Sequence, residues 1–178
     1  MDSIIGVVGT ILGTILGWVL NSISNKGKLK IYISSWKDNF QYNDTGSMVP
    51  SKSKEQTECY HYDLILDLYN PSNETKILRN IKVEFGDGKS ILYTSIPKDD
   101  ATKRWNGPVA FYDSIVPLNI PPKTIIQLKL HDGAWDTDGG LDFIWNTQII
   151  YLIYDNEKGK KKRMVIKKEN YSNYFNTQ

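Results

Sequence analysis

Apolar residues are concentrated at the start of the chain, where residues 4–20 (IIGVVGTILGTILGWVL) contain no charge and no proline. This run approaches the roughly 20 residues that a helix needs to cross a bilayer core about 30 Å thick, at the short end of the range. A cleaved signal peptide is disfavoured, because the chain opens with Asp2 and no small-residue cleavage site follows Leu20. A buried helix of a soluble protein is the remaining alternative. We predict that residues 1–27 form a transmembrane helix and its juxtamembrane linker.

The charges that flank this helix predict its orientation. Lys26, Lys28 and Lys30 follow it, whereas only Asp2 and the terminal amine lie on the other side. Cytoplasmic loops of membrane proteins are enriched in Lys and Arg. We therefore expect a single-pass protein of the cell membrane, with its N-terminus outside and residues 28 onward in the cytoplasm.

Small and polar residues gather on one face of the predicted helix, at about 100° per residue. The stripe consists of Gly6, Gly9, Thr10, Gly13, Thr14, Gly17 and Asn21. Helices associate in lipid through close approach at small residues, so the stripe predicts a homo-oligomer seam. Two alternatives stay open. In the first, the helices surround a narrow pore that is lined by the threonines and Asn21. In the second, the glycines only reflect how common glycine is in membrane helices.

Beyond the helix the pattern changes to an alternation of apolar and polar residues, which is typical of half-buried strands. Residues 60–69, 81–85 and 126–130 alternate in this way, and residues 149–154 are apolar on both faces, as in a central strand. Clusters rich in Asn, Asp, Pro and Gly separate these runs, as turns do. About seven short strands of this kind predict a two-layer antiparallel β-sandwich over residues 28–168.

Other segments lack the alternation. Residues 37–58 are polar and are predicted to form a long exposed loop. Residues 97–113 and 131–146 are also expected to be irregular. Residues 169–178 are expected to form an unstructured or loosely packed C-terminal tail.

The order of the segments LILDLYNPSNETKILRNIKVEF, LNIPPKTIIQLKL and IIYLIY resembles that of small bacterial immunoglobulin- or fibronectin-III-like domains. This resemblance covers roughly residues 28–168 and implies a mainly β chain with an antiparallel immunoglobulin-like β-sandwich. The paired cysteines of antibody domains are absent from the sequence. The layout of an anchor followed by a cytosolic sandwich resembles that of membrane-acting effectors of bacterial anti-phage systems. A fold of this kind implies no particular function by itself.

Composition narrows the classes of function. The formal charge of +2 over 178 residues gives no basic excess, so no nucleic acid is expected as a partner. The single cysteine, Cys59, excludes an intramolecular disulfide and a closed cysteine-based zinc site. We find no Ser-His-Asp, Cys-His, phosphate-loop or dinucleotide motif, and therefore expect neither an enzyme nor a cofactor.

A basic run near the C-terminus predicts contact with lipid headgroups. Its cations are Lys158, Lys160, Lys161, Lys162 and Arg163. In a standard sandwich the hairpin between the last two strands lies at the end where the chain enters, which here is the membrane end. Cations near an anionic leaflet attract it by about 1 kcal/mol each, so this run would act together with Lys26, Lys28 and Lys30. A solvated turn is the alternative.

Two further groups of residues suggest binding chemistry. Cys59, His61 and Asp63 share one strand face, but a metal would need another ligand and His131 is the only other histidine, so a solvated face is expected and no metal. The loop around Asp136 and Asp138 suits calcium only loosely and is better explained as a turn.

Large aromatic residues occur near this loop. Trp105, Trp135 and Trp145 could wall a pocket for a ligand or partner, together with Asp136 and Asp138. Core packing explains the three tryptophans equally well.

Taken together, the sequence predicts a membrane-anchored, self-associating effector or channel-like subunit. Its cytosolic sandwich would sense a signalling ligand or a protein partner, and the layout suggests a place in anti-phage defence. The alternative is a membrane-tethered adaptor without pore activity.

Overall fold

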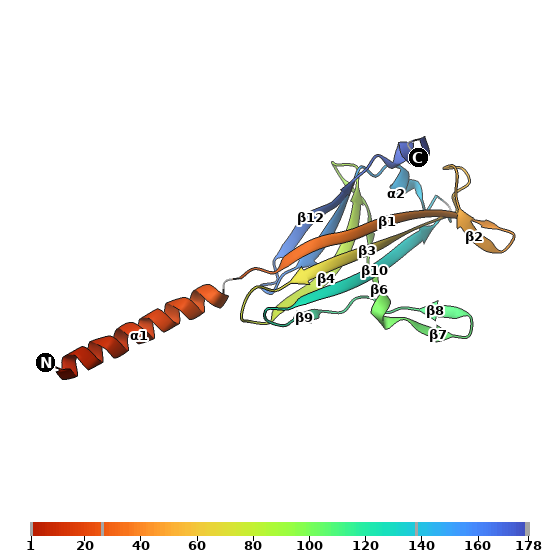
Figure 1. Ribbon diagram of the computed structural model, residues 1–178. Helices are drawn as coiled ribbons and strands as arrows, with labels where there is room; N and C mark the ends of the chain where they lie inside the picture. Colours follow the sequence, from red (N-terminus) through yellow and green to blue (C-terminus); the bar gives the residue numbers. More distant parts are fainter. Residues whose placement is uncertain (1, 26, 138, 177–178) are drawn as a thin grey trace.

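The computed structural model describes the backbone of residues 2–25, 27–137 and 139–176, and the side chains of residues 10–22, 27–137 and 139–175. Its first element, α1 (Asp2–Asn25), is a helix of 24 residues that projects from the rest of the molecule as a separate rod (Figure 1). A helix of this length measures about 36 Å. Within the part of the chain that is described, no helix combines the length and the hydropathy of a membrane-spanning segment.

The first of two antiparallel sheets carries the chain away from α1. Its strand order is β2-β1-β3-β10-β6. The strands are β1 (Lys30–Asp44), β2 (Ser47–Pro50), β3 (Cys59–Tyr69), β6 (Lys98–Asp99) and β10 (Ile125–Trp135). The long central strand β3 pairs with β1 on one side and with β10 on the other.

The second sheet has the order β12-β11-β4-β5, and β9 pairs with the start of β4. Its strands are β4 (Lys76–Gly86), β5 (Ile91–Ser95), β9 (Leu118–Ile120), β11 (Ile149–Asp155) and β12 (Lys161–Lys168). Three short helices lie in the connections and at the C-terminal end: η1 (Asp100–Thr102), α2 (Asp142–Trp145) and η2 (Tyr171–Asn176).

A short hairpin, which we call the arm, projects from the end of the sandwich opposite α1 (Figure 1). It consists of β7 (Arg104–Asn106) and β8 (Val109–Phe111), which form a two-stranded sheet of their own. The Arg104 guanidinium holds both oxygens of Asp113 at 2.7 Å beside the arm. This regular pairing lies within a segment whose composition predicts irregular structure.

The core between the two sheets follows from the alternation along β3. Five of its side chains are almost completely buried: Tyr60, Tyr62, Leu64, Leu66 and Leu68. Side chains alternate across a strand, so this phase places all five on one face. Buried residues of the facing sheet, such as Val83, Phe85 and Leu152, belong to the same cluster. The predicted mainly β, two-layer antiparallel sandwich is confirmed.

Residues 37–58 differ from the long polar loop that their composition predicts. Strand β1 continues to Asp44, and Thr45 and Gly46 then turn the chain into β2. Both turn residues have positive φ, 52° and 93°, as a tight hairpin of the I′ type requires. The polar residues are misleading because one face of an antiparallel sheet can meet water. Phe40, on the other face, is buried in the core.

Within the predicted C-terminal tail, residues 169–176 are more ordered than their sequence suggests. Tyr171 is buried, and its hydroxyl donates a hydrogen bond of 2.8 Å to Asp38. The ring of Tyr174 lies 4.6 Å from that of Phe40. Aromatic side chains three residues apart within η2 therefore pack this segment onto the core, although polar residues separate them in the sequence.

Candidate functional site at the junction of helix and sandwich

The α1 side chains from Thr10 to Asn21 are all exposed, including the large apolar ones. The residues with the most exposed apolar surface, with fractions between 53% and 71%, are Ile11, Leu12, Ile15, Leu16, Trp18 and Leu20. Exposed apolar patches of this kind mark surfaces that meet a partner or a membrane. The helix thus carries apolar surface that the sandwich does not cover.

The small-residue stripe of α1 is open. Its members with described surroundings are all exposed: Thr10, Gly13, Thr14, Gly17 and Asn21. A Cβ atom added to Gly13 or Gly17 meets nothing within 4 Å outside the local helix backbone. The Thr14 hydroxyl donates to the Thr10 carbonyl at 2.9 Å, so it is satisfied within its own helix. Gly6 and Gly9 belong to the α1 backbone, and their surroundings lie outside the described side chains.

The described part of the linker between α1 and β1, residues 27–29, lies closely against the turn after β3. A Cβ atom on Gly27 would come within 2.9 Å of the Ser72 backbone nitrogen and 3.2 Å of the Pro71 carbonyl carbon. Carbon atoms in good contact are about 3.5–4.0 Å apart. Only glycine therefore allows this approach, and the contact fixes where the linker meets the sandwich.

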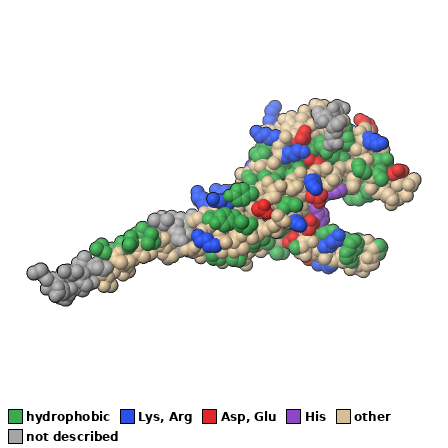
Figure 2. Space-filling view, viewed as in Figure 1, with side chains coloured by type: hydrophobic (Ala, Val, Ile, Leu, Met, Phe, Trp, Pro, Cys, Tyr) green, Lys and Arg blue, Asp and Glu red, His purple; other side chains and the backbone are tan. Residues whose placement is uncertain are grey.

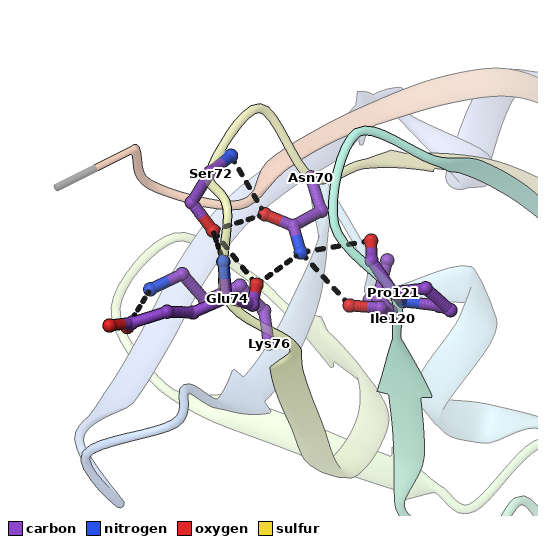
Figure 3. Close-up of polar contacts among 6 residues, drawn as sticks. All are labelled: Asn70, Ser72, Glu74, Lys76, Ile120 and Pro121. Carbon is purple, nitrogen blue, oxygen red and sulfur yellow. Dashed lines mark hydrogen bonds and ion pairs between the residues drawn. The ribbon is translucent and has the colours of Figure 1, made fainter. Parts of the chain in front are cut away.

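The turn beneath the linker is held by the buried side chain of Asn70 (Figure 3). Its amide nitrogen donates to the backbone carbonyls of Glu74 at 2.8 Å, Ile120 at 2.9 Å and Pro121 at 3.0 Å. Its amide oxygen accepts from the Ser72 amide at 3.0 Å and hydroxyl at 2.7 Å. One side chain thus joins the turn after β3 to the end of β9. The sequence indicates a turn here but not this network.

A recess of about 690 Å³ opens beside this turn, between the linker, the start of β4 and the β11–β12 hairpin. We call it the lysine recess, after the five lysines that line it: Lys28, Lys76, Lys158, Lys160 and Lys162. Only two acidic residues, Glu74 and Glu157, are among its lining residues, which leaves a formal excess of three positive charges. Figure 2 shows blue side chains gathered where α1 joins the sandwich.

The structure separates the basic residues that the sequence groups together. Lys28, Lys158, Lys160 and Lys162 meet in the recess, which places the last hairpin beside the linker, as its position in a standard sandwich predicts.

The other cations lie elsewhere. Lys161 lines a different hollow, and the Arg163 guanidinium stacks 3.4 Å from the centre of the Tyr151 ring. Lys30 lies on β1, outside the recess. Lys26 lies outside the described residues.

Lys76 is the site residue that the sequence reasoning misses. Its side chain is only 9% exposed, and its ammonium meets the Glu74 carboxylate at 4.0 Å, the outer limit of an ion pair. Lys76 shares its strand face with the buried Leu78. A lysine in phase with a core leucine is the pattern that would have revealed it.

The opposite end of the sandwich holds a second hollow, of about 620 Å³, at the base of the arm. Figure 2 shows the histidines, in purple, in this indentation. Cys59, His61, Asp63 and His131 all line it. Among the described residues no group of three or more His, Cys, Asp or Glu is placed to hold a metal. Cys59 is buried rather than solvated, and its burial raises the pKa of the thiol.

The three tryptophans do not form one wall. Trp145 is buried in the core, Trp135 is exposed and lines the second hollow, and Trp105 is exposed on the arm. Asp136 is exposed, with its carboxylate 3.4 Å from the Leu141 amide. Asp138 lies outside the described residues. Of the residues predicted to wall one pocket, only Trp135 lines the second hollow, together with His61 and His131.

Comparison with known proteins finds a relative by sequence and solved structures that align at low identity. The chain is 28% identical over 130 residues to the SPbeta prophage-derived uncharacterized protein YopI of Bacillus subtilis (strain 168), covering 70% of this chain and 72% of that protein. A structure of the putative ApaA protein from Bordetella pertussis aligns with a TM-score of 0.38 and 11% identity, over 80% of this chain and 91% of that one.

An uncharacterized β-sandwich protein from Clostridium difficile 630 aligns with a TM-score of 0.35 and 16% identity, over 79% of this chain and 86% of that one. Residues 27–167 match the family described as the YopI Ig-like domain. This match begins at Gly27, where the linker contacts the turn after β3, and ends within β12. The chain therefore belongs to the YopI Ig-like domain family.

Proposed function

We propose that this chain is a membrane-tethered interaction protein, in which α1 inserts its apolar side chains into lipid and the sandwich is held at the membrane surface. The observation that carries the proposal is the exposed apolar surface of α1, which has fractions up to 71% at Trp18. Removing one such side chain from water contributes about 1.5–3 kcal/mol. Several side chains on one helix would give a stable anchor without any enzyme chemistry.

The charges at the junction support a cytoplasmic position for the sandwich. Four lysines of the recess come from the linker and the β11–β12 hairpin, at the end of the sandwich where α1 is attached. An anionic cytoplasmic leaflet attracts each nearby Lys or Arg by about 1 kcal/mol. Under this proposal the second hollow, at the far end of the sandwich, is free to meet a cytosolic partner.

Flotation of the full chain with phosphatidylcholine vesicles tests the anchor. The natural chain is expected to float with these neutral vesicles, whereas a Leu12→Asp/Leu16→Asp variant should remain in the dense fraction, because charges are costly within lipid. A Leu12→Ile/Leu16→Ile variant, which keeps the apolar surface, is the matched control. Equal flotation of the aspartate variant would contradict the proposal, provided that its near-UV circular dichroism shows an intact sandwich.

A self-associating effector or channel-like subunit is the second candidate, and the open stripe at Gly13 and Gly17 favours it. The prophage origin of the Bacillus subtilis relative is compatible with a role in conflict between phage and host, such as anti-phage defence. A Gly13→Leu/Gly17→Leu variant should then reduce the mass of the detergent-solubilised protein in light scattering to that of a monomer. A natural chain that is already monomeric would leave only the tethered interaction domain.

A further inference from the structure

We propose that the lysine recess is a binding site for one phosphate-bearing anion, with the ammonium of Lys76 as the buried cation in its wall. This inference rests on the proposed function, because a recess beside the helix attachment would face lipid headgroups. It adds that one recess with a defined set of lysines binds the anion, in place of a diffuse attraction between lysines and an anionic surface. The burial of Lys76, the convergence of the other lysines and the geometry of the β11–β12 hairpin support the site.

The Lys76 side chain is only 9% exposed, and its ammonium is only loosely paired. Burying a charge is costly unless the charge is paired and hydrogen-bonded. The carboxylate of Glu74 lies 4.0 Å away, and the Glu74 side chain is 58% exposed, so solvent competes for it (Figure 3). A phosphate oxygen beside Lys76 would supply the close acceptor that this lysine needs.

The remaining lysines reach the recess from segments that are far apart in the sequence. Lys28 belongs to the linker after α1, and Lys158, Lys160 and Lys162 belong to the β11–β12 hairpin. The recess volume of about 690 Å³ exceeds what a single phosphate group needs and leaves room for the rest of a headgroup. Ammonium groups bind phosphate as point charges from several directions, which suits such an arrangement.

The hairpin is built so that alternate lysines face the recess. The Asn156 side-chain oxygen accepts from the backbone amides of Lys158 at 3.1 Å and Lys160 at 2.9 Å, which fixes the turn. Lys160 and Lys162 line the recess, whereas Lys161 between them lines a separate hollow. Successive side chains of a strand point to opposite faces, which accounts for this alternation. The chain thus contains a matched pair of adjacent lysines with equal charge and different orientation.

Lipid phosphate is the source that the position favours, since the linker that follows α1 forms one wall of the recess. A soluble phosphate compound would present the same chemistry. The two sources differ in where the anion is found, and the experiment separates them.

The test measures binding of the full chain to phosphatidylcholine vesicles with and without phosphatidic acid. For the natural chain we expect tighter binding to the vesicles that contain phosphatidic acid. Lys160→Gln should reduce this preference about fivefold, the equivalent of about 1 kcal/mol per lysine, whereas Lys161→Gln should change it less than about twofold. Lys76→Met should reduce it about tenfold or more, because it removes the buried cation. Equal losses for Lys160→Gln and Lys161→Gln would indicate diffuse attraction and overturn the proposal.

A second arm titrates the full chain in detergent micelles with inorganic phosphate and follows the amide resonances of the β11–β12 hairpin. Shifts that Lys160→Gln weakens and Lys161→Gln does not would support a site that also accepts soluble phosphate. A preference for phosphatidic acid without such shifts would assign the site to lipid. The absence of both the preference and the shifts would overturn the proposal. Binding to neutral vesicles reports on the helix alone. If the natural chain does not bind neutral vesicles, the proposed membrane anchor is refuted. The phosphate-induced shifts then still test anion binding in the lysine recess.

Discussion

Helix α1 and strand β3 are both rich in apolar side chains, yet the protein treats them in opposite ways. Leu16 of α1 is 62% exposed, whereas Leu66 of β3 is completely buried. In β3 the apolar side chains recur with period two and meet a second sheet. In α1 they surround most of the helix, and no other described element covers them. A helix that is apolar on most sides belongs in a core or in a membrane.

The difference shows that apolar content alone does not decide burial. A complementary apolar surface within the chain is also needed, and only the strands have one. The α1 side chains keep their apolar surface for a medium or a partner outside the chain.

The same substitution in the two regions should give very different changes in stability. Leu66→Ala should lower the free energy of unfolding of the sandwich by about 3 kcal/mol, because it leaves a cavity in a packed core. Leu16→Ala should leave that free energy unchanged, because Leu16 contacts no part of the core. Urea denaturation in detergent, followed by tryptophan fluorescence, measures both. A comparable loss for Leu16→Ala would mean that α1 packs against the sandwich.

A buried carboxylate shows the same contrast for polar groups. The Asp38 side chain is 3% exposed and accepts hydrogen bonds from Lys167 at 2.7 Å, Tyr60 at 2.8 Å and Tyr171 at 2.8 Å. Asp38→Asn should lower the free energy of unfolding by about 2 kcal/mol, less than a fully buried pair would lose, because Lys167 is partly exposed.

An exposed ion pair provides the control for that carboxylate. Asp113→Asn removes the partner of Arg104, and both of these side chains are largely exposed. Exposed pairs contribute little, so this variant should unfold like the natural chain. Equal destabilisation by Asp38→Asn and Asp113→Asn would contradict the importance of burial.

Two Asn-x-Ser turns of similar geometry differ in what covers them. Asn70 and Asn170 each accept a hydrogen bond of 2.7 Å from the serine hydroxyl two residues later. Asn70 is buried at the junction, and Asn70→Ala should cost about 2 kcal/mol because it leaves backbone carbonyls without donors. Asn170 is exposed, and Asn170→Ala should cost clearly less. Thermal unfolding compares the two variants, and a reversed order would contradict the described network.

The smallest effect concerns His61 in the second hollow. Burial lowers the pKa of His61, and the nearby Asp63 charge only partly opposes this. The unfolded chain therefore takes up a proton at higher pH than the folded chain, so stability should fall as the pH drops below about 6.5. His61→Gln should reduce this loss. If urea denaturation shows the same loss of stability between pH 7 and pH 5 for the variant and the natural chain, the assignment of this loss to His61 is contradicted.

Much of the sandwich can be predicted from the sequence because the pattern of apolar positions in β3, β4 and β11 is clear. The β1–β2 hairpin does not, because its outward residues are polar and only Phe40 marks the inward face near its end. The packing of η2 is hidden in the sequence for a related reason, since Tyr171 and Tyr174 lie among polar residues and make their contacts only in the folded chain.

The junction could be predicted only in part. Chain order in a sandwich places the basic hairpin near the linker, and the structure brings Lys158, Lys160 and Lys162 to Lys28. The burial of Lys76 and the convergence of three carbonyls on Asn70 depend on tertiary contacts that no local pattern encodes. The separation of Lys161 from its neighbours follows from strand alternation, which a charge count ignores.

Amide hydrogen exchange of the full chain in phosphatidylcholine nanodiscs shows whether lipid covers α1. Amides within lipid are withheld from water, and amides of a packed strand exchange only when the domain opens. If lipid covers α1, the amides of residues 10–22 should be protected to a degree comparable with those of β3. Exchange of these helix amides at the rate of an uncovered surface helix, with β3 still protected, would contradict the insertion of α1 into lipid.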